Sequence, residues 1–343
     1  MNRPENVKTV AIIRSGALGD TVYATSILNA LTKQYGDEIK IDWIGAPSAQ
    51  SLFKNDPRVN HVFIIKHRKV PVWLSPEKRK IVAFSKKNPY DLLINLESNG
   101  PIFNPLAEKT RARYKIGYPF TEPVKSEGPQ HMVETIRATY AGIIDDAILK
   151  NAYPKLFGSD FNVLKKKFSL PEKYIVINPS NSHTNRSRIN YRAWPAEKWK
   201  ELISTLGKKE NLILIGNRGE EEYFEQLKPY PDNVIDLSAK TNLPELIAVM
   251  SHAQALITTD TGPAHIASAT STPVFCLVGP TNPAFTGPYK TPFNEVHIIS
   301  KNLACSPCYY LPHIKDCTDN ICMKEITVED VMNALSEKLH ESH

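Results

Sequence analysis

The sequence predicts an α/β protein made of two successive Rossmann-like domains, and three observations support this fold class. Short apolar runs typical of buried parallel strands alternate with helical segments along most of the chain. Glycine-containing or polar loops follow several of these runs, at the strand ends where open α/β sheets bind ligands. A length of 343 residues exceeds one ordinary hydrophobic core. We therefore expect two lobes, each an α/β/α layer structure, facing a central cleft.

Composition and charge narrow the class of partner. The formal net charge is +6, which suits an anionic partner without naming it. The basic residues form no continuous stripe and no nucleic-acid-binding motif is present, so a nucleic-acid partner is not expected. No apolar run is long enough to span a bilayer, and the first residues lack the apolar core of a signal peptide. The expected location is therefore the cytoplasm.

The first domain, expected over residues 1–168, opens with a strand, a glycine-containing loop and a helix. The loop has the spacing G-x-x-G, at Gly16 and Gly19, rather than the full G-x-G-x-x-G of a dinucleotide site. A nicotinamide enzyme is therefore disfavoured. The remaining pattern predicts strands at 7–13, 39–44, 62–65 and 92–96, and helices at 21–35, 76–85 and 132–144.

Asp20 stands where this loop meets the helix, at the carboxyl edge of the expected sheet. A carboxylate in this position can cap the helix, and from local sequence alone that interpretation is at least as good as a functional one. The functional interpretation is a carboxylate that faces the carboxyl edge of the sheet, where open α/β sheets bind their ligands.

A basic segment with interleaved apolar residues occupies positions 66–87. Its lysines and arginines flank the expected helix, and Trp73, Leu74 and Phe84 lie among them. The ordinary interpretation is a solvated helix face. The alternative is a surface that meets an anionic lipid layer.

The second domain, expected over residues 169–325, follows a linker near 157–171 where the periodic pattern breaks. A polar loop at 179–184, with Arg186 and Arg188 after it, follows the first strand. The pattern predicts strands at 174–178, 211–215, 234–236, 255–258 and 274–278. It predicts helices at 195–208, from 220, at 243–251, from 262 to before Pro273, and at 328–340 within a C-terminal segment 326–343.

The stretch 255–281 is the one around which this domain is organised. It predicts a buried strand, a tight turn, a short helix and a second buried strand. The free N–H groups at the start of the helix would suit a phosphate. Singly, Asp260 and Thr261 are better explained as caps and His265 as a packed histidine. As a cluster at a strand end, with Gly262 and Pro263, they indicate a binding site.

Three segments together resemble the lipopolysaccharide heptosyltransferase family. They are Leu18-Gly19-Asp20, the segment 192–199 that begins Arg-Ala-Trp-Pro, and Asp260-Thr-Gly-Pro-Ala-His265 with Gly279-Pro-Thr281. The resemblance covers nearly the whole chain. It implies the GT-B fold of glycosyltransferase family 9, with an acceptor-binding N-terminal lobe and an ADP-heptose-binding C-terminal lobe. It also implies transfer with inversion to a Kdo–lipid A or inner-core acceptor, at the inner face of the cytoplasmic membrane.

The resemblance assigns roles to individual residues. Asp20 is the general base, and Arg192 takes the place of a basic residue that contacts the donor phosphates. Thr261, Gly262, Pro263 and His265 match the diphosphate-binding turn. Asp260 matches a donor-binding acid, Glu220 an acid at the donor nucleoside, and Thr241 falls near the adenine. These residue types suit the chemistry, because the transfer needs one base and positive charge for the leaving diphosphate, with no catalytic cofactor.

Other functions remain open at this point. A related glycosyltransferase could use another nucleotide sugar or a protein acceptor. A non-enzymatic alternative is a two-lobed sugar-binding protein, although such proteins are usually exported. The sequence does not name the heptose, the acceptor sugar or the choice between a lipid-linked and a protein acceptor.

Four cysteines, Cys305, Cys308, Cys317 and Cys322, lie within eighteen residues near the end of the chain. Because cytosolic chains rarely hold disulfides, this set predicts a structural zinc or iron site. The spacing is not that of a standard zinc finger. A reduced, unliganded set and oxidative pairing after purification are therefore the alternatives.

Overall fold

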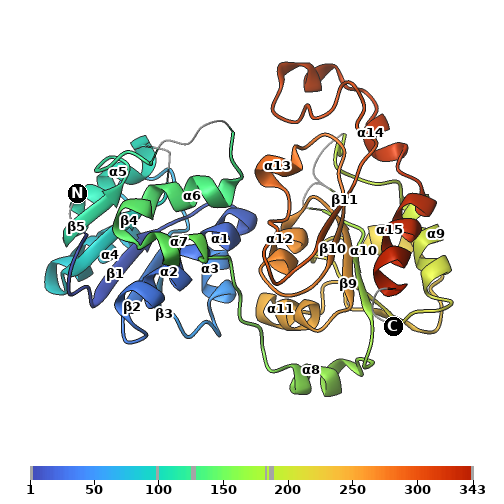
Figure 1. Cartoon of the computed structure of the whole chain (residues 1–343), viewed down its shortest axis with the longest axis horizontal. Coiled ribbons are helices and arrows are strands. Elements are labelled where there is room, and N and C mark those ends of the chain that lie inside the picture. Colours follow the sequence, from blue (N-terminus) through green and yellow to red (C-terminus); the bar gives the residue numbers. More distant parts are fainter. Residues whose placement is uncertain (1–2, 98–99, 125–128, 182–183, 185–188, 341–343) are drawn as a thin grey trace. The chain divides into compact units, whose positions relative to one another are not determined.

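The computed structural model describes residues 3–97, 100–124, 129–181, 184 and 189–340, and it divides into two compact units (Figure 1). These units are Met1–Phe157 and Gly158–His343. Each contains one parallel β-sheet with helices packed on it, which confirms the predicted α/β fold class.

The first unit holds a five-stranded parallel sheet in the order β3-β2-β1-β4-β5. The chain builds outward from β1 on one side and from β4 on the other, so the strand order reverses between these two neighbours. Ligands of open α/β sheets bind at the carboxyl ends of the strands flanking such a reversal. The strands are β1 (Thr9–Ile13), β2 (Lys40–Gly45), β3 (Val59–Ile64), β4 (Tyr90–Asn95) and β5 (Ala112–Gly117).

The first unit differs from expectation in two predicted helices and in several elements that were not predicted, which include α3 (Pro47–Leu52) and α7 (Asp146–Lys150). The predicted helix 21–35 is two helices, α1 (Leu18–Ala24) and α2 (Ser26–Tyr35), which meet at Thr25. The predicted helix 132–144 ends at Tyr140 in α6 (Met132–Tyr140) and continues as a 3₁₀ turn, η1 (Ala141–Ile143). Strand β5 and α5 (Gly100–Lys109) were missed. The remaining helix among the described residues of this unit is α4 (Pro76–Lys87).

The second unit holds a six-stranded parallel sheet in the order β11-β10-β9-β6-β7-β8. Here the strand order reverses between β9 and β6, so their carboxyl ends are the expected ligand edge. The strands are β6 (Ile175–Asn178), β7 (Leu212–Leu214), β8 (Val234–Asp236), β9 (Ala255–Thr259), β10 (Val274–Leu277) and β11 (Val296–Ile299).

The predicted linker contains a helix, α8 (Phe161–Phe168), which packs on the second unit. The ring of Phe161 stacks on His252 with centroids 3.7 Å apart, and Lys167 pairs with Glu245 at 2.7 Å. The other helical segments are α9 (Ala196–Leu206), α10 (Glu221–Gln226), α11 (Leu243–Ser251), α12 (Gly262–Ser268), α13 (Pro283–Thr286), η2 (Pro312–Asp316), α14 (Ile321–Lys324) and α15 (Val328–His340).

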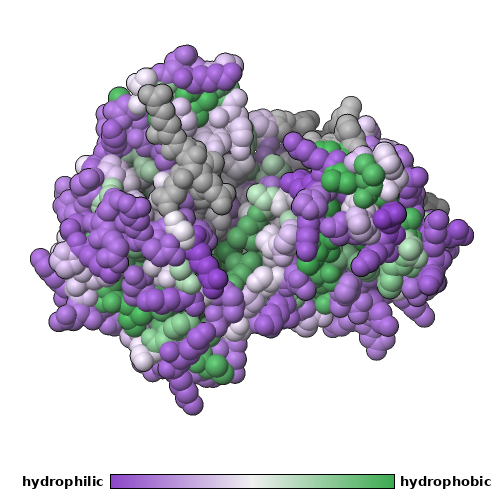
Figure 2. Space-filling model, turned by 180° about the vertical axis from the view of Figure 1, so that it is seen from behind, coloured by the Kyte–Doolittle hydropathy of each residue, from purple (hydrophilic) through white to green (hydrophobic). Residues whose placement is uncertain are grey.

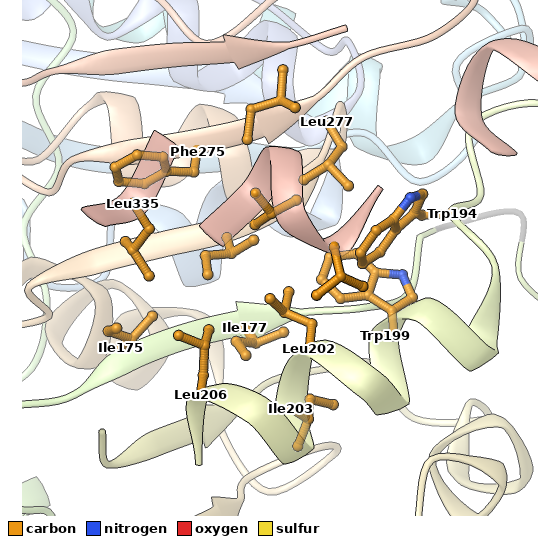
Figure 3. Packing of buried hydrophobic residues seen from close by; sticks show 14 of the residues in the cluster. Ile175, Ile177, Trp194, Trp199, Leu202, Ile203, Leu206, Phe275, Leu277 and Leu335 are labelled. Atoms are coloured by element: carbon orange, nitrogen blue, oxygen red, sulfur yellow. The ribbon is translucent and has the colours of Figure 1, made fainter. Parts of the chain in front are cut away.

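A buried apolar cluster fastens α9 and α15 to one face of the second sheet (Figure 3). Ile177 of β6 lies beside Leu202 and Leu206 of α9. Leu335 of α15 lies beside Phe275 of β10. Trp194 and Trp199 meet edge to face with ring centroids 4.8 Å apart. The Trp194 indole also donates to the Ile326 carbonyl at 2.9 Å, which ties the segment before α9 to the segment before α15.

The surface contrasts with this interior. The face shown in Figure 2 is mostly hydrophilic, with smaller apolar areas between charged side chains. No helix among the described residues combines the length and apolar character needed to cross a bilayer.

The chain passes from the first unit to the second once, between Phe157 and Gly158, and it is held on both sides of that point. The Lys155 amide donates to the Thr25 hydroxyl at 3.2 Å. The Ser159 amide donates to the Pro244 carbonyl at 2.9 Å. A Cβ atom on Gly158 would lie 2.6 Å from the Ala248 amide nitrogen, so only glycine fits this approach to α11.

Candidate functional site

Asp20 lies at the first turn of α1, where the chain leaves β1 at the reversal of the first sheet. Its Oδ2 accepts the Ala17 amide at 3.2 Å, which gives part of the capping role that local sequence suggested. Its Oδ1 lies 3.5 Å from Nη2 of Arg14. A Cβ atom on Gly16 would lie 2.7 Å from both Cβ and Oδ2 of Asp20, so the glycine makes room for this carboxylate.

Glu97 is a second carboxylate at the same edge, and the sequence interpretation missed it. It follows β4, the neighbour of β1, and is 4% exposed. Its Oε1 accepts the Ser15 amide, and its Oε2 lies 3.8 Å from Arg68. Its position could have indicated it in the sequence, because an acidic residue two positions after a buried strand lies at the ligand-binding edge of the sheet. Asp20 therefore has a neighbouring strand end that carries a second acid.

Arg14 links the two strand ends. Its Nη1 donates to the Leu96 carbonyl at 2.9 Å, while its Nε is buried without a hydrogen-bond partner among the described residues. The hydroxyl of Ser15 is also buried and has none. Buried polar atoms normally have hydrogen-bond partners, so these two atoms indicate that this sheet edge can form further hydrogen bonds.

In the second unit, Asp260 and Thr261 leave the carboxyl end of β9 beside β6. The capping interpretation is wrong for Thr261, which occupies the N-cap position of α12 without a side-chain capping bond. Oδ1 of Asp260 is buried and has no hydrogen-bond partner among the described residues. Instead, Asn178 of β6 donates to the hydroxyls of Thr258 and Thr261 at 3.1 and 3.4 Å. The polar groups of this edge are thus oriented by each other and leave a buried carboxylate oxygen available.

Gly262 and Pro263 form the first turn of α12, as predicted, and His265 follows on the same turn. Nε2 of His265 lies 3.8 Å from Oδ1 of Asp260. Helix α12 has only seven residues, so its dipole is short. Most of the positive charge at this edge therefore has to come from a side chain.

Arg192 supplies that charge. Its Nη1 donates to the main-chain carbonyl of Asp260 at 2.9 Å, and its Nε is buried without a hydrogen-bond partner among the described residues. The guanidinium carbon lies 5.3 Å from the ring centroid of Tyr309. The buried Trp194, two residues further on, fixes this segment in the core.

The Gly279-Pro280-Thr281 motif follows β10, next to β9. The Pro280 carbonyl accepts the amides of Cys308 and Tyr309 at 2.8 and 2.9 Å. The Thr281 hydroxyl is buried and has no hydrogen-bond partner among the described residues. Asp260, Arg192 and Thr281 thus each contribute a buried polar atom with unused hydrogen-bonding capacity to the loops at this sheet edge.

Glu220 is buried and joins two loops that follow neighbouring strands. Its Oε2 accepts the Ser180 hydroxyl at 2.6 Å and the Asn217 amide at 2.8 Å. Ser180 follows β6 and Asn217 follows β7, so the carboxylate fixes both loops at the carboxyl edge of the sheet.

Thr241 lines a pocket of about 500 Å³ at the start of α11. Lys167, Arg218 and Lys240 give this pocket a positive lining, and Glu245 adds one acid. The other lining residues are Gly216, Asn217, Ala239, Asn242, Leu243 and Leu246. Asn217 belongs both to this pocket and to the loop that Glu220 holds, so the pocket adjoins the buried acid.

The four tail cysteines are free thiols. Among the described residues, no group of three or more His, Cys, Asp or Glu side chains is placed to hold a metal ion. Burial, followed by the nearby Cys305 and Cys317, raises the pKa of Cys308. Burial, followed by Cys308, raises the pKa of Cys322 to about 11. The thiols therefore lie near enough to influence one another.

Part of the predicted polar loop after β6 lies outside the described residues. This applies to Ser182, His183, Arg186 and Arg188.

Comparisons with known proteins give the family. The profile of glycosyltransferase family 9 (heptosyltransferase) matches residues 109–317. The lipopolysaccharide core heptosyltransferase OpsX of Haemophilus influenzae is 25% identical over 360 residues, covering 97% of each chain. The lipopolysaccharide heptosyltransferase 1 of Campylobacter coli is 25% identical and covers 96% of this chain and 98% of its own.

Solved structures share the fold. A family 9 glycosyltransferase from Veillonella parvula aligns with a TM-score of 0.78 at 21% identity, covering 99% of this chain and 100% of that one. The E. coli heptosyltransferase WaaC with ADP aligns with a TM-score of 0.69 at 20% identity, covering 96% and 99%. The iron-containing dodecameric glycosyltransferase TibC of enterotoxigenic E. coli aligns with a TM-score of 0.58 at 14% identity, covering 99% and 78%.

The profile match covers more than half of the chain, and the heptosyltransferase relatives span nearly all of it. The structural neighbours confirm the GT-B fold class. An enzyme of this family is neither a sugar-binding protein nor a nicotinamide enzyme. The chain belongs to glycosyltransferase family 9, the heptosyltransferase family, and is a glycosyltransferase.

Proposed function

We propose that this enzyme transfers a heptose from ADP-heptose, with inversion, to an inner-core lipopolysaccharide acceptor of the Kdo- or heptose-lipid A type. The observation that carries the proposal is the edge between β6 and β9, where Oδ1 of Asp260 and Nε of Arg192 are buried without hydrogen-bond partners among the described residues. Buried groups of opposite charge that lack hydrogen-bond partners at a strand-order reversal are typical of a polar ligand site. The WaaC relative was solved with ADP, which supports the choice of nucleotide.

The donor diphosphate is assigned to Arg192 and the turn formed by Thr261, Gly262 and Pro263, with His265 beside it. Arg192 offers a guanidinium whose Nε is unused among the described residues, and guanidinium groups bind phosphate oxygens in a bidentate manner. The N–H groups of the turn add donors. During transfer, negative charge builds up on the leaving ADP, so these groups would stabilise the transition state more than the bound donor.

The donor nucleoside is assigned to the pocket lined by Thr241. Its volume of about 500 Å³ lies within the range of small-molecule sites. Glu220 adjoins this pocket through Asn217. Its Oε1 atom accepts one long hydrogen bond, from the Asn217 side-chain amide at 3.3 Å. An ionised carboxylate can accept the hydrogen bond that a ribose hydroxyl donates.

Calorimetric titration with ADP tests the donor site. The double variant Thr261→Ala, His265→Ala should weaken ADP binding, because it removes two polar groups at the turn, while its circular dichroism spectrum stays that of the wild type. His297→Ala, on the edge strand β11, is the control and should keep wild-type affinity. Unchanged affinity in the double variant would refute the assignment.

Asp20 is assigned as the general base that takes the proton from the attacking acceptor hydroxyl. Its carboxylate is about one-third exposed at the β1 edge, so a bound hydroxyl can reach it. The transfer needs no catalytic cofactor, because the base deprotonates the acceptor hydroxyl and the positive charge of the donor site stabilises the leaving diphosphate.

The alternative donors and acceptors can be separated directly. Incubation of the enzyme with a panel of nucleotide sugars, each with a lipid A-linked acceptor and with a protein acceptor, should give product only with ADP-heptose and the glycolipid. Transfer from a different nucleotide sugar, or to protein alone, would replace the proposed function by that alternative.

We further propose that the enzyme acts in the cytoplasm as a peripheral protein at the inner face of the cytoplasmic membrane. Trp73 and Leu74, just before α4, are 71% and 53% exposed, and Phe84 on α4 is 39% exposed. Exposed lysines at 66, 69 and 80 surround them in the sequence. Exposed aromatic and aliphatic side chains among cations favour an anionic lipid surface.

Sedimentation with vesicles tests this surface. The protein should bind vesicles rich in anionic lipid and not zwitterionic ones, and Trp73→Ser, Leu74→Ser should reduce that binding. Phe293→Ser, which changes a residue that is 71% exposed in the second unit, is the matched control. Equal binding by the wild type and the double variant would exclude this surface.

For the cysteines, we propose a structural zinc or iron ion held by Cys305, Cys308, Cys317 and Cys322. Both metals bind well to thiolates. The four thiols affect one another's pKa. In the described structure they are not arranged as metal ligands, so binding would require this segment to rearrange. Protein purified without chelator or metal-affinity resin should contain near-stoichiometric metal, and Cys305→Ser, Cys308→Ser should lack it. Metal-free wild-type protein would remove the idea.

A further inference from the structure

We propose that Tyr309 is a positioning residue of the donor site: its ring holds the Arg192 guanidinium in place for the donor diphosphate. This inference rests on the proposed function and deepens it. Tyr309 lies in the segment that carries the tail cysteines, so the proposal gives that segment a part in donor binding.

The interaction itself is the first support. The guanidinium carbon of Arg192 lies 5.3 Å from the Tyr309 ring centroid, within the range of a cation–π interaction. On another side, Nη1 of Arg192 donates to the Asp260 carbonyl at 2.9 Å. A long, flexible side chain is thus fixed by one aromatic ring and one carbonyl, and its Nε remains without a hydrogen-bond partner among the described residues.

The second support is the kind of group that contacts the Arg192 guanidinium. No carboxylate of the described residues lies within ion-pair distance of Arg192, whereas Arg14 and Arg68 of the first unit each lie within 4.0 Å of one. A carboxylate would neutralise the guanidinium and compete with a diphosphate. A ring face and a carbonyl orient the cation while leaving its charge available to an anion.

The anchoring of Tyr309 is the third support. Its amide and that of Cys308 both donate to the Pro280 carbonyl, at 2.9 and 2.8 Å, and the Ser306 hydroxyl donates to the Gly279 carbonyl. The ring is therefore tied through its own backbone to the Gly-Pro-Thr motif next to β9. A ring fixed in this way can hold a side chain in one rotamer, which reduces the entropy lost on binding.

Calorimetry with ADP and steady-state kinetics with the sugar donor test the proposal. Tyr309→Ala should weaken ADP binding by about five- to thirtyfold, the effect of removing one partly buried cation–π interaction. It should raise the KM for the donor and leave the KM for the acceptor unchanged. Tyr309→Phe keeps the ring face and should stay within about twofold of the wild type. Leu311→Ala, in the same segment and half exposed, is the control and should keep wild-type affinity.

The outcomes separate this inference from the proposed function. If the wild type binds ADP and the Thr261→Ala, His265→Ala variant does not, but Tyr309→Ala binds as the wild type does, then only the role of Tyr309 is refuted. If the wild type binds no ADP, the proposed function fails as well. If Tyr309→Phe loses as much affinity as Tyr309→Ala, the ring face is not the cause, which also overturns the inference.

Discussion

Replacement of Asp20 by asparagine separates a catalytic carboxylate from a helix cap. The native Oδ2 accepts the Ala17 amide at 3.2 Å, and the asparagine oxygen can accept the same bond. The substitution removes the ion pair with Arg14, which spans 3.5 Å and involves a carboxylate that is 36% exposed. Solvent screens the Asp20 end of this ion pair but not the Arg14 side chain, which is 9% exposed, so we expect the free energy of unfolding to fall by about 1–2 kcal/mol.

The effect on turnover should be far larger. An asparagine amide cannot take the proton of the acceptor hydroxyl, and removal of a general base typically lowers the rate by about a hundred- to ten-thousandfold. This corresponds to about 2.7–5.4 kcal/mol in the activation barrier. The gap between this figure and the decrease in stability is what makes the variant decisive.

The assay compares turnover, ADP affinity and thermal unfolding of Asp20→Asn with those of Glu97→Gln. Glu97 lies at the end of the neighbouring strand, and its Oε1 accepts the Ser15 amide, which glutamine can preserve through its own oxygen. Only Asp20→Asn should lose its turnover, while both variants keep ADP affinity. Near-normal turnover in Asp20→Asn together with a collapse in Glu97→Gln would transfer the role of base to Glu97.

Three further predictions concern other parts of the sites. Gly16→Ala would place a Cβ atom 2.7 Å from Oδ2 of Asp20, so turnover should fall by roughly tenfold or more with unchanged ADP affinity in calorimetry. Glu220→Ala leaves the buried Ser180 hydroxyl and the partly buried Asn217 amide without their acceptor and should lower the unfolding free energy in a urea titration by about 1–3 kcal/mol; if Glu220→Gln, which keeps an acceptor oxygen, loses as much, the bonds are not the cause. In protein stripped of metal by a chelator, Cys322 has a pKa of about 11, and because a raised pKa favours the neutral thiol it should alkylate slowly at pH 8, after the exposed Cys305, and faster as the pH approaches that value; mass spectrometry that found Cys322 modified first would contradict this.

The sequence predicted the elements whose patterns are local and strong. Strand β8 and helices α11 and α15 have the predicted bounds, because each combines an apolar repeat with a clear start signal or turn. Strand β5 was missed because it is an edge strand that carries Arg113 and Lys115, so it lacks the apolar run of a buried strand. The break at Thr25 was missed because it depends on a hydroxyl bond to the Val22 carbonyl.

The residues of the candidate sites also divide into those that local sequence could place and those that it could not. Asp20, Asp260 and the turn after it could be placed from strand ends and glycines alone. The role of Glu220 as a link between two loops and the interaction of Tyr309 with Arg192 could not, because each joins segments far apart in the sequence. Such interactions depend on how the strands are ordered in the sheet, which local patterns do not encode.

The fastening of the chain around the division between the units has a consequence for the backbone that joins them. Lys155 is tied to the first unit and Ser159 to the second, which leaves only the three residues 156–158 between two fixed points. The backbone that joins the two units therefore has few torsions outside the fastened residues. Gly158 can supply such torsions, but its approach to Ala248 excludes a larger residue. A substitution at Gly158 would therefore disturb the packing of this connection on α11 while changing no residue at the carboxyl edge of either sheet.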